Sequence, residues 1–287
     1  MITNPLSEMI LKQFHERTRK RFHSLGFQSK TLETKVGTLH FFVRNGEVGP
    51  GSVVLVHGLG TSSSTWLRTI PRLTDSRTLI ALDLPGFGFS TVQGAQGFAA
   101  FREHQHALTE FLDALRGGPL TLVGHSFGGW LCARYAAASP NRVQHLVLVN
   151  SVGVYFQGIE QLREKFILKS VADTRLLLNA MWYRYPWYLK PLTGAIHREL
   201  TRRQINELVA SIGREDLLVE ELERLTMPVS LIWGRNDGII PPEAADTLLR
   251  AVPRARIFFI ERCGHVPQLE RPQQFAAVFH EALRRVP

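Results

Sequence analysis

The chain has 287 residues, of which 44% are hydrophobic and 21% charged, and its 34 lysines and arginines exceed its 25 aspartates and glutamates by nine. These ordinary values exclude a wholly disordered chain. No apolar run approaches the roughly 18–20 residues of a membrane-spanning helix. The first residues also lack the pattern of a signal peptide. Two distant cysteines, Cys132 and Cys263, make no disulfide framework, so we expect a cytoplasmic protein.

Residues 1–30 are predicted to form a basic N-terminal helical extension, with six lysines and arginines against two glutamates. Leu6, Met9, Ile10 and Phe14 follow a helical repeat, which predicts a weak peripheral contact with an anionic membrane. The alternative, that this helix packs on the body of the protein and only solubilises it, stays open. The rest of the chain has no zinc-finger spacing and no aromatic RNA-binding motif, so we expect no nucleic-acid partner.

After residue 31, short apolar runs alternate with amphipathic segments, which is typical of a parallel sheet covered by helices on both faces. The alternation lapses over residues 151–225, where leucine, arginine and aromatic residues predict helices. We therefore expect an α/β core made of residues 31–150 and 226–287, with a helical cap at 151–225. The expected strands cover residues 38–44, 52–57, 77–83, 120–125, 143–150, 229–234 and 255–261.

The sequence Gly-His-Ser-Phe-Gly-Gly at 124–129 stands between a predicted strand and a predicted helix. This is the place of a Gly-x-Ser-x-Gly turn, whose glycines leave room for a sharply exposed serine. Taken alone, Ser126 could equally be a helix cap. As a nucleophile it would need a base and an acid to orient that base.

Two later strands supply candidates for these groups. Asp237 follows the run at 229–234, and His265 follows the run at 255–261. Carboxyl ends of parallel strands meet at one edge of a sheet, where open α/β proteins place their sites. The order Ser126, Asp237, His265 is also the order that this type of turn uses. We therefore predict a catalytic triad of these three residues.

An acyl-transfer site also needs hydrogen-bond donors for the oxyanion. His-Gly-Leu-Gly at 57–60 follows another predicted strand, so we expect the backbone N–H groups of Leu59 and Phe127 to be these donors. We expect His57 to orient this loop. His104 and His106 lie two residues apart on a predicted helix and point to different faces, so no metal site is expected.

With these motifs in place, the chain resembles the α/β-hydrolase superfamily, in its serine-nucleophile branch, and most closely its monoacylglycerol-lipase-like and carboxylesterase members. The resemblance implies a mostly parallel, doubly wound sheet of about eight strands with an inserted helical cap, and it implies no cofactor. It assigns the same nucleophile, acid, base and oxyanion donors. Some members carry the acid one strand earlier, and Asn150 occupies that place here. The motifs lie at 57–60, 83–90, 124–129, 233–241 and 261–272.

The resemblance leaves three functions open. The first is hydrolysis of small apolar carboxylic esters with short-to-medium acyl chains, monoacylglycerols among them. The second is carbon–carbon bond hydrolysis of ring-cleavage dienoates, although such enzymes usually carry tryptophan after the catalytic histidine, where this chain has Val266. The third is a ligand receptor of the same fold with little turnover. The complete triad and the near-balanced charge of residues 151–225, 11 basic against 10 acidic, favour the ester hydrolase.

Overall fold

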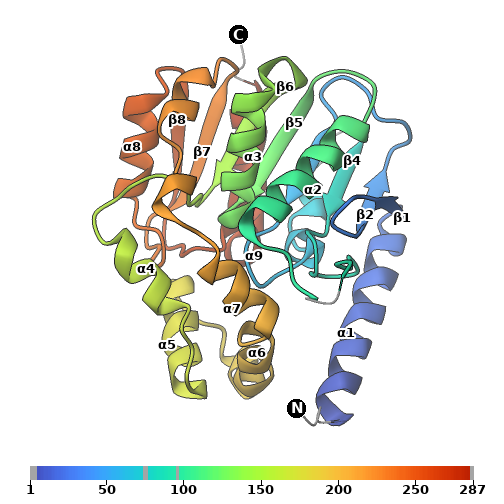
Figure 1. Ribbon diagram of the computed structural model, residues 1–287, viewed down its shortest axis with the longest axis vertical. Helices are drawn as coiled ribbons and strands as arrows, with labels where there is room; N and C mark the ends of the chain where they lie inside the picture. Colours follow the sequence, from blue (N-terminus) through green and yellow to red (C-terminus); the bar gives the residue numbers. More distant parts are fainter. Residues whose placement is uncertain (1–4, 74–76, 95–96, 285–287) are drawn as a thin grey trace.

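The computed structural model describes residues 5–73, 77–94 and 97–284, with the backbone alone over residues 5–11. Among these residues, eight strands form one sheet in the order β1-β2-β4-β3-β5-β6-β7-β8 (Figure 1). β2 is antiparallel to both of its neighbours, and all the other neighbouring pairs are parallel. The predicted mostly parallel α/β sheet is therefore confirmed. The strands are β1 Gln28–Glu33, β2 Thr38–Arg44, β3 Val53–Val56, β4 Leu79–Leu82, β5 Leu120–His125, β6 Val143–Val149, β7 Val229–Gly234 and β8 Ala255–Ile260.

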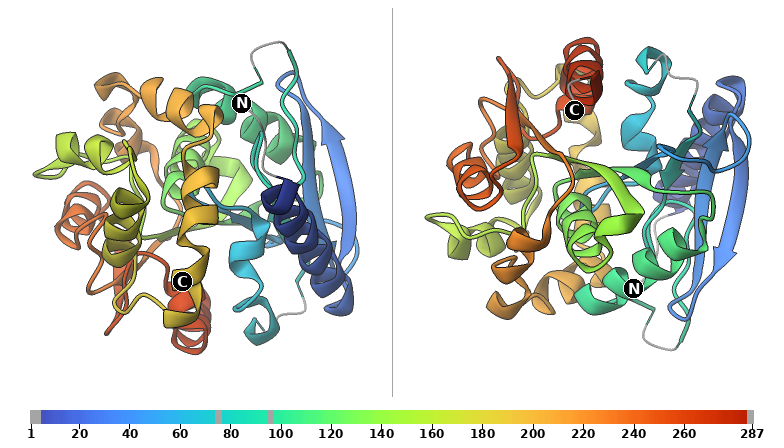
Figure 2. Two further views of the ribbon diagram at one scale, coloured as in Figure 1. Left: turned by 90° about the horizontal axis from the view of Figure 1, so that it is seen from below. Right: turned by 90° about the horizontal axis from the view of Figure 1, so that it is seen from above.

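Helices cover both faces of the sheet. One face packs against α2, α3 and α8, and the other packs against α1 and α10 through a second apolar core (Figure 2). β3, β5 and β7 are buried along their whole length because they lie between these two layers. The helices are α1 Pro5–Ser24, α2 Phe101–Ala114, α3 Phe127–Ala138, α4 Ile159–Lys165, α5 Val171–Met181, α6 Thr193–Leu200, α7 Arg203–Ala210, α8 Glu243–Ala251, α9 Pro267–Glu270 and α10 Pro272–Arg284.

The sequence-based prediction misses β1. This strand is at the edge of the sheet, and its residues Gln-Ser-Lys-Thr-Leu-Glu are almost all exposed, so it lacks an apolar run. Polar edge strands of this kind are common because they discourage pairing with other chains. The prediction of a helical extension over residues 1–30 is accordingly wrong at its end, since α1 stops at Ser24 and residues 28–30 belong to β1.

Residues 151–225, hereafter the insertion, lie between β6 and β7 and contain α4, α5, α6 and α7. In Figure 1 these helices form one end of the molecule, next to the edge of the sheet where the parallel strands end. The N-terminal end of α1 reaches the same end of the molecule. Both cysteines are free and buried. Within the described ranges, no helix combines the length and the apolar character needed to cross a membrane.

Candidate active site

The turn between β5 and α3 presents Ser126. β5 ends at His125, and α3 begins at Phe127, so Ser126 alone makes the turn, with φ +51° and ψ −118°. Such a left-handed conformation is strained for a residue with a side chain, and strain of this kind concentrates at functional sites. Gly128 permits the turn, because a Cβ there would collide with the carbonyl oxygens of His57 and Val56.

Asp237 and His265 form a buried hydrogen-bonded pair. His265 Nδ1 donates to Asp237 Oδ2 at 2.7 Å, and both side chains are almost completely removed from solvent. The other carboxylate oxygen, Oδ1, accepts the backbone N–H groups of Ile239 at 2.7 Å and Ile240 at 3.0 Å. A carboxylate at Nδ1 selects the tautomer that leaves the Nε2 lone pair available, which is the state required of a general base.

Asn150 also holds this carboxylate. It follows β6, and its Nδ2 donates to Asp237 Oδ2 at 2.6 Å while its Oδ1 accepts the N–H of Gly234 at 3.2 Å. From the sequence, Asn150 is only the place where some family members carry the acid. The one signal that could have marked Asn150 as a site residue is its position after a buried strand, because the carboxyl ends of neighbouring strands lie together.

The insertion holds the loops that carry Asp237 and His265. The last carbonyl groups of a helix have no hydrogen-bond donor within the helix. At the end of α5, the loops that carry Asp237 and His265 supply these donors. The carbonyl of Ala180 accepts the N–H of Gly238 at 3.1 Å, and the carbonyl of Met181 accepts the N–H of His265 at 2.7 Å. The residue after Asp237 and the residue before His265 are both glycine, since a Cβ at Gly238 would crowd Ala180 and one at Gly264 would collide with Met181.

The loop after β3 lies against Ser126. A Cβ on Gly58 would come within 3.2 Å of Ser126 Cβ, so this loop and the turn are in direct contact. His57 fixes the loop from inside, because its Nδ1 donates to the carbonyl of Gly58 at 2.8 Å and its Nε2 accepts the N–H of Leu84 at 2.9 Å. Burial lowers the pKa of His57 and keeps it neutral. The expectation that His57 orients the loop is confirmed.

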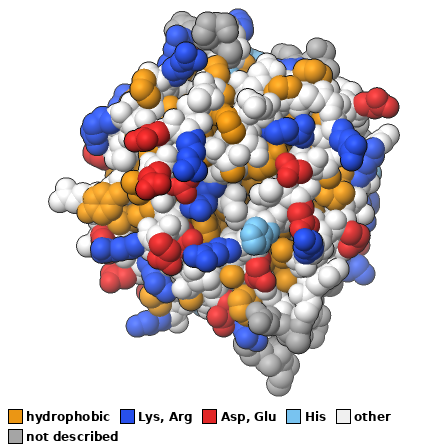
Figure 3. Space-filling view, turned by 45° about the horizontal axis from the view of Figure 1, so that its top comes forward, with side chains coloured by type: hydrophobic (Ala, Val, Ile, Leu, Met, Phe, Trp, Pro, Cys, Tyr) orange, Lys and Arg blue, Asp and Glu red, His pale blue; other side chains and the backbone are white. Residues whose placement is uncertain are grey.

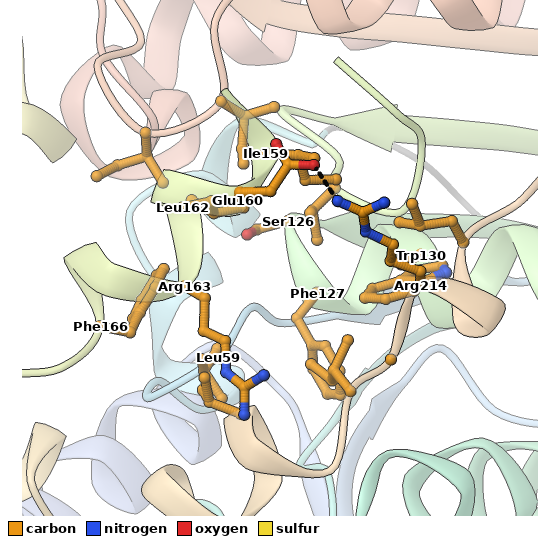
Figure 4. Close-up of a pocket in the computed structure, with 17 residues that line it drawn as sticks. Leu59, Ser126, Phe127, Trp130, Ile159, Glu160, Leu162, Arg163, Phe166 and Arg214 are labelled. Carbon is orange, nitrogen blue, oxygen red and sulfur yellow. Dashed lines mark hydrogen bonds and ion pairs between the residues drawn. The ribbon is translucent and has the colours of Figure 1, made fainter. Parts of the chain in front are cut away.

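A cavity of about 410 Å³ opens from Ser126 into the insertion (Figure 4). Ligand pockets commonly span roughly 300–1,000 Å³, so this one suits a small ligand. Leu59 and Phe127, the predicted oxyanion donors, line it together with Ser126. Glu160 and Arg214 pair across it at 2.8 Å, as the dashed line in Figure 4 marks. Most of the lining is apolar and comes from Trp130, Val152, Ile159, Leu162, Phe166, Val209, Ile212, Leu217, Ile239 and Ile240.

The structure thus brings the predicted residues together as two groups that meet at His125. Ser126, Phe127 and Leu59 share the cavity, and Asp237 is bonded to His265. His125 joins the groups, because it directly precedes Ser126 and its Nε2 donates to the carbonyl of His265 at 2.8 Å. Within the described residues, no hydrogen bond runs from Ser126 Oγ to the imidazole. Such bonds are often long in unliganded enzymes and tighten with substrate.

His104 is a buried histidine in contact with Phe127. The ring is buried, packs edge to face with Phe127 with 5.4 Å between centroids, and leaves Nδ1 without a hydrogen-bond partner in the described chain. Burial, with a smaller contribution from His57, lowers the pKa of His104 to about 3. Within the described residues, no cluster of histidine, cysteine, aspartate or glutamate could hold a metal ion.

Replacing His104 with phenylalanine is expected to make the protein less sensitive to acid. The pKa of His104 is about 3 in the folded state and about 6.5 in an unfolded chain. The unfolded state therefore binds more protons between these values, and stability is lost as the pH falls through this window. His104→Phe should reduce the loss of unfolding free energy between pH 7 and pH 5 by about 2 kcal/mol. Urea unfolding at both pH values measures the difference.

His106→Phe is the matched control, because His106 lies on the same helix but is exposed. This variant should show the pH dependence of the unchanged protein. If His104→Phe and the unchanged protein lost the same unfolding free energy between pH 7 and pH 5, His104 would not be the buried neutral group described.

Comparisons with known proteins bear on the fold and on the family of the chain. Residues 53–278 match the model of the alpha/beta hydrolase family. 2-Hydroxy-6-oxo-2,4-heptadienoate hydrolase of Pseudomonas putida is 30% identical over 254 residues, which cover 83% of this chain and 91% of that protein. Lipase 1 of Psychrobacter immobilis is 28% identical over 256 residues, covering 84% and 79%. A crystal structure of a bacterial membrane phospholipase A superposes with a TM-score of 0.82 at 24% identity, covering 97% and 92%, and shows the shared fold.

Proposed function

The chain belongs to the alpha/beta hydrolase family, and from this premise we propose that it cleaves small apolar carboxylic esters through an acyl-enzyme intermediate. The observation that carries the proposal is the placement of Ser126 at the base of a mostly apolar cavity, in a strained turn beside the bonded pair of Asp237 and His265. Ser126 is the nucleophile, His265 the base and Asp237 the acid. The reaction draws on these side chains and on backbone donors.

In the first half of the reaction, Ser126 Oγ attacks the ester carbonyl carbon while His265 Nε2 accepts the hydroxyl proton. The carbonyl oxygen becomes an oxyanion, which accepts the N–H groups of Leu59 and Phe127. The start of α3 at Phe127 adds the positive end of its helix dipole. His265 then returns the proton to the alcohol oxygen as the bond to it breaks. Water repeats these steps on the acyl-enzyme and releases the acid.

The apolar walls of the cavity support an acyl chain as the bound group. Each methylene that moves from water into such a wall contributes about 0.8 kcal/mol. A cavity near the lower end of the usual range favours short-to-medium chains over long ones. We expect kcat/KM to rise over the first added carbons and then to level off once the cavity is filled. Glycerol monoesters with such chains belong to the same class.

Replacing Val209 with phenylalanine should shift this preference toward shorter chains. Val209 lines the cavity from α7, so a larger side chain occupies the volume that distal methylenes would use. Loss of room for about two methylenes should lower kcat/KM for the best medium-chain ester about tenfold, with little change for the acetate. Steady-state kinetics on esters of graded acyl length measure both values.

Val219→Phe is the control, because Val219 is 70% exposed and does not line the cavity. It should leave the chain-length profile unchanged. An unchanged profile in Val209→Phe would show that the acyl chain binds elsewhere.

Carbon–carbon bond hydrolysis is the second candidate. It is favoured by the similarity to the heptadienoate hydrolase and by Arg163 and Arg214, which line the cavity and could bind a carboxylate. Against it, Arg214 is paired with Glu160, Arg163 donates to the carbonyl of Ala210 at 3.3 Å, and Val266 follows His265. Turnover of a ring-cleavage dienoate without turnover of any neutral ester would replace the ester proposal with this one.

A further inference from the structure

The outer part of the insertion exposes large apolar side chains. Trp187 and Tyr188, in the 3-10 helix Trp187–Leu192, are 78% and 53% exposed, and Leu176 of α5 is 69% exposed. Single exposed apolar residues are ordinary, but their concentration in one short segment favours an interaction site there. Ile167, Val171 and Leu192 extend the set.

Basic residues are concentrated in the same segment. Residues 167–203 contain seven lysines and arginines and two acidic residues, although residues 151–225 as a whole are nearly balanced at 11 against 10. All seven basic side chains are exposed, and two of them, Arg202 and Arg203, pair with glutamates of the insertion. We name this segment with its exposed apolar and basic side chains the distal face. The seven are Lys169, Arg175, Arg184, Lys190, Arg198, Arg202 and Arg203.

α1 adds a second basic element at the same end of the molecule (Figure 1). Lys12, Arg17 and Arg21 are exposed on it, and Phe14 is 49% exposed. Phe22 is buried against the sheet, so the end of α1 is fixed to the body. Leu6, Met9 and Ile10, the other apolar residues of the predicted membrane contact, have side chains outside the described part of the chain.

The face that includes the top of the molecule carries charges of both signs. In Figure 3, which turns the top forward, acidic and basic side chains are intermingled across the visible face.

The combination of exposed tryptophan, tyrosine and leucine with lysine and arginine matches the headgroup region of a bilayer. That region accepts aromatic rings at the level of the headgroups, and anionic lipids attract basic residues next to them. A nucleic acid would pair with the charges but leave Leu176 and Leu192 exposed. A second copy of the chain would cover the apolar residues but bring two surfaces of like charge together.

The geometry points to the distal face, with α1 beside it, as a docking surface for an anionic phospholipid bilayer. Trp187 and Tyr188 enter the headgroup layer, and the basic residues of the distal face and of α1 contact the lipid phosphates and carboxylates. The contact is peripheral and weakens with salt. It uses no residue of the active site and does not depend on the proposed ester hydrolysis.

The test is sedimentation of the full chain with vesicles of phosphatidylcholine alone and of phosphatidylcholine mixed with phosphatidylserine, at low and high salt. We expect binding to the mixed vesicles, loss of binding at high salt, and a blue shift of tryptophan fluorescence that Trp187→Ala removes. Arg175→Glu with Lys190→Glu, and separately Trp187→Ala with Tyr188→Ala, should each lower the partition coefficient at least about tenfold. Arg17→Glu with Arg21→Glu should also lower the partition coefficient, because it reverses two of the basic charges that α1 adds to the contact.

Tyr155→Ala with Val219→Ala is the matched control, because both residues are more than half exposed but lie outside the distal face. This variant should bind like the unchanged chain. All variants should keep their activity on a soluble short-chain ester, and failure of that activity in the unchanged chain would affect the proposed function alone. Equal binding to neutral and anionic vesicles, or a dimer that Trp187→Ala dissociates in the absence of vesicles, would overturn the membrane proposal.

Discussion

Ser126→Ala is expected to lower kcat for every ester by about six orders of magnitude, the loss seen when the nucleophilic serine is removed from a serine protease with the same three groups. Without Oγ no acyl-enzyme can form, and only binding and the oxyanion donors remain, which leave roughly 10³–10⁴ over the uncatalysed reaction. The fold should be unaffected, because the backbone N–H of Ser126, bonded to Val149 at 2.9 Å, is retained. Steady-state kinetics and covalent labelling with an organophosphorus probe measure the effect.

Ser139→Ala is the matched control, since Ser139 lies just past the other end of the same helix and is not part of the cavity. Ser139→Ala should be labelled by the organophosphorus probe and should turn over esters at the normal rate. Near-normal turnover by Ser126→Ala would end the assignment of the nucleophile. Absence of labelling in the unchanged protein would favour a ligand receptor with little turnover.

The sheet could be predicted from the sequence because burial on both faces leaves a simple signal. All seven predicted strands are present, and their ends differ by two residues at most, as for β4, predicted over 77–83 and found at Leu79–Leu82. β1 could not be predicted, because a polar edge strand is specified by its pairing with β2 rather than by its own hydrophobicity.

The candidate site likewise contains residues that the sequence predicts and contacts that it does not. Ser126, Asp237 and His265 could be proposed from the chain alone, because each follows a recognisable strand and parallel strands end at one edge of the sheet. The contact of Asn150 with Asp237 spans 87 residues, and the bond from His265 N to the carbonyl of Met181 spans 84. The first contact follows from the parallel pairing of β6 with β7. The second depends on how the insertion packs on the core, and no local pattern specifies that packing.

Asp237→Asn should reduce kcat by about 10⁴, the loss found for the equivalent change in a serine protease, with KM little changed. Two backbone N–H groups, of Ile239 and Ile240, bind Oδ1, so the amide oxygen must take that position. The NH₂ group then replaces Oδ2 and faces Nδ1 of His265. Because NH₂ can only donate, His265 must carry its proton on Nε2 and can no longer accept one from Ser126. Separate kcat and KM values, with a thermal unfolding curve, test this, and a loss of less than tenfold would contradict it.

The double variant Asp237→Asn with Asn150→Asp tests the proton position on His265 separately from the stability of the contact between residues 150 and 237. In Asp237→Asn the new NH₂ also faces the NH₂ of Asn150, which lay 2.6 Å from the lost oxygen, so the variant should lose stability as well as activity. Adding Asn150→Asp restores a donor and an acceptor at this contact and returns the net charge to its original value. We expect the thermal unfolding midpoint to recover while kcat stays low, because His265 still faces an NH₂ group. Recovery of kcat would mean that a carboxylate at the end of β6 can orient His265, and it would contradict the argument that Asp237 must do so.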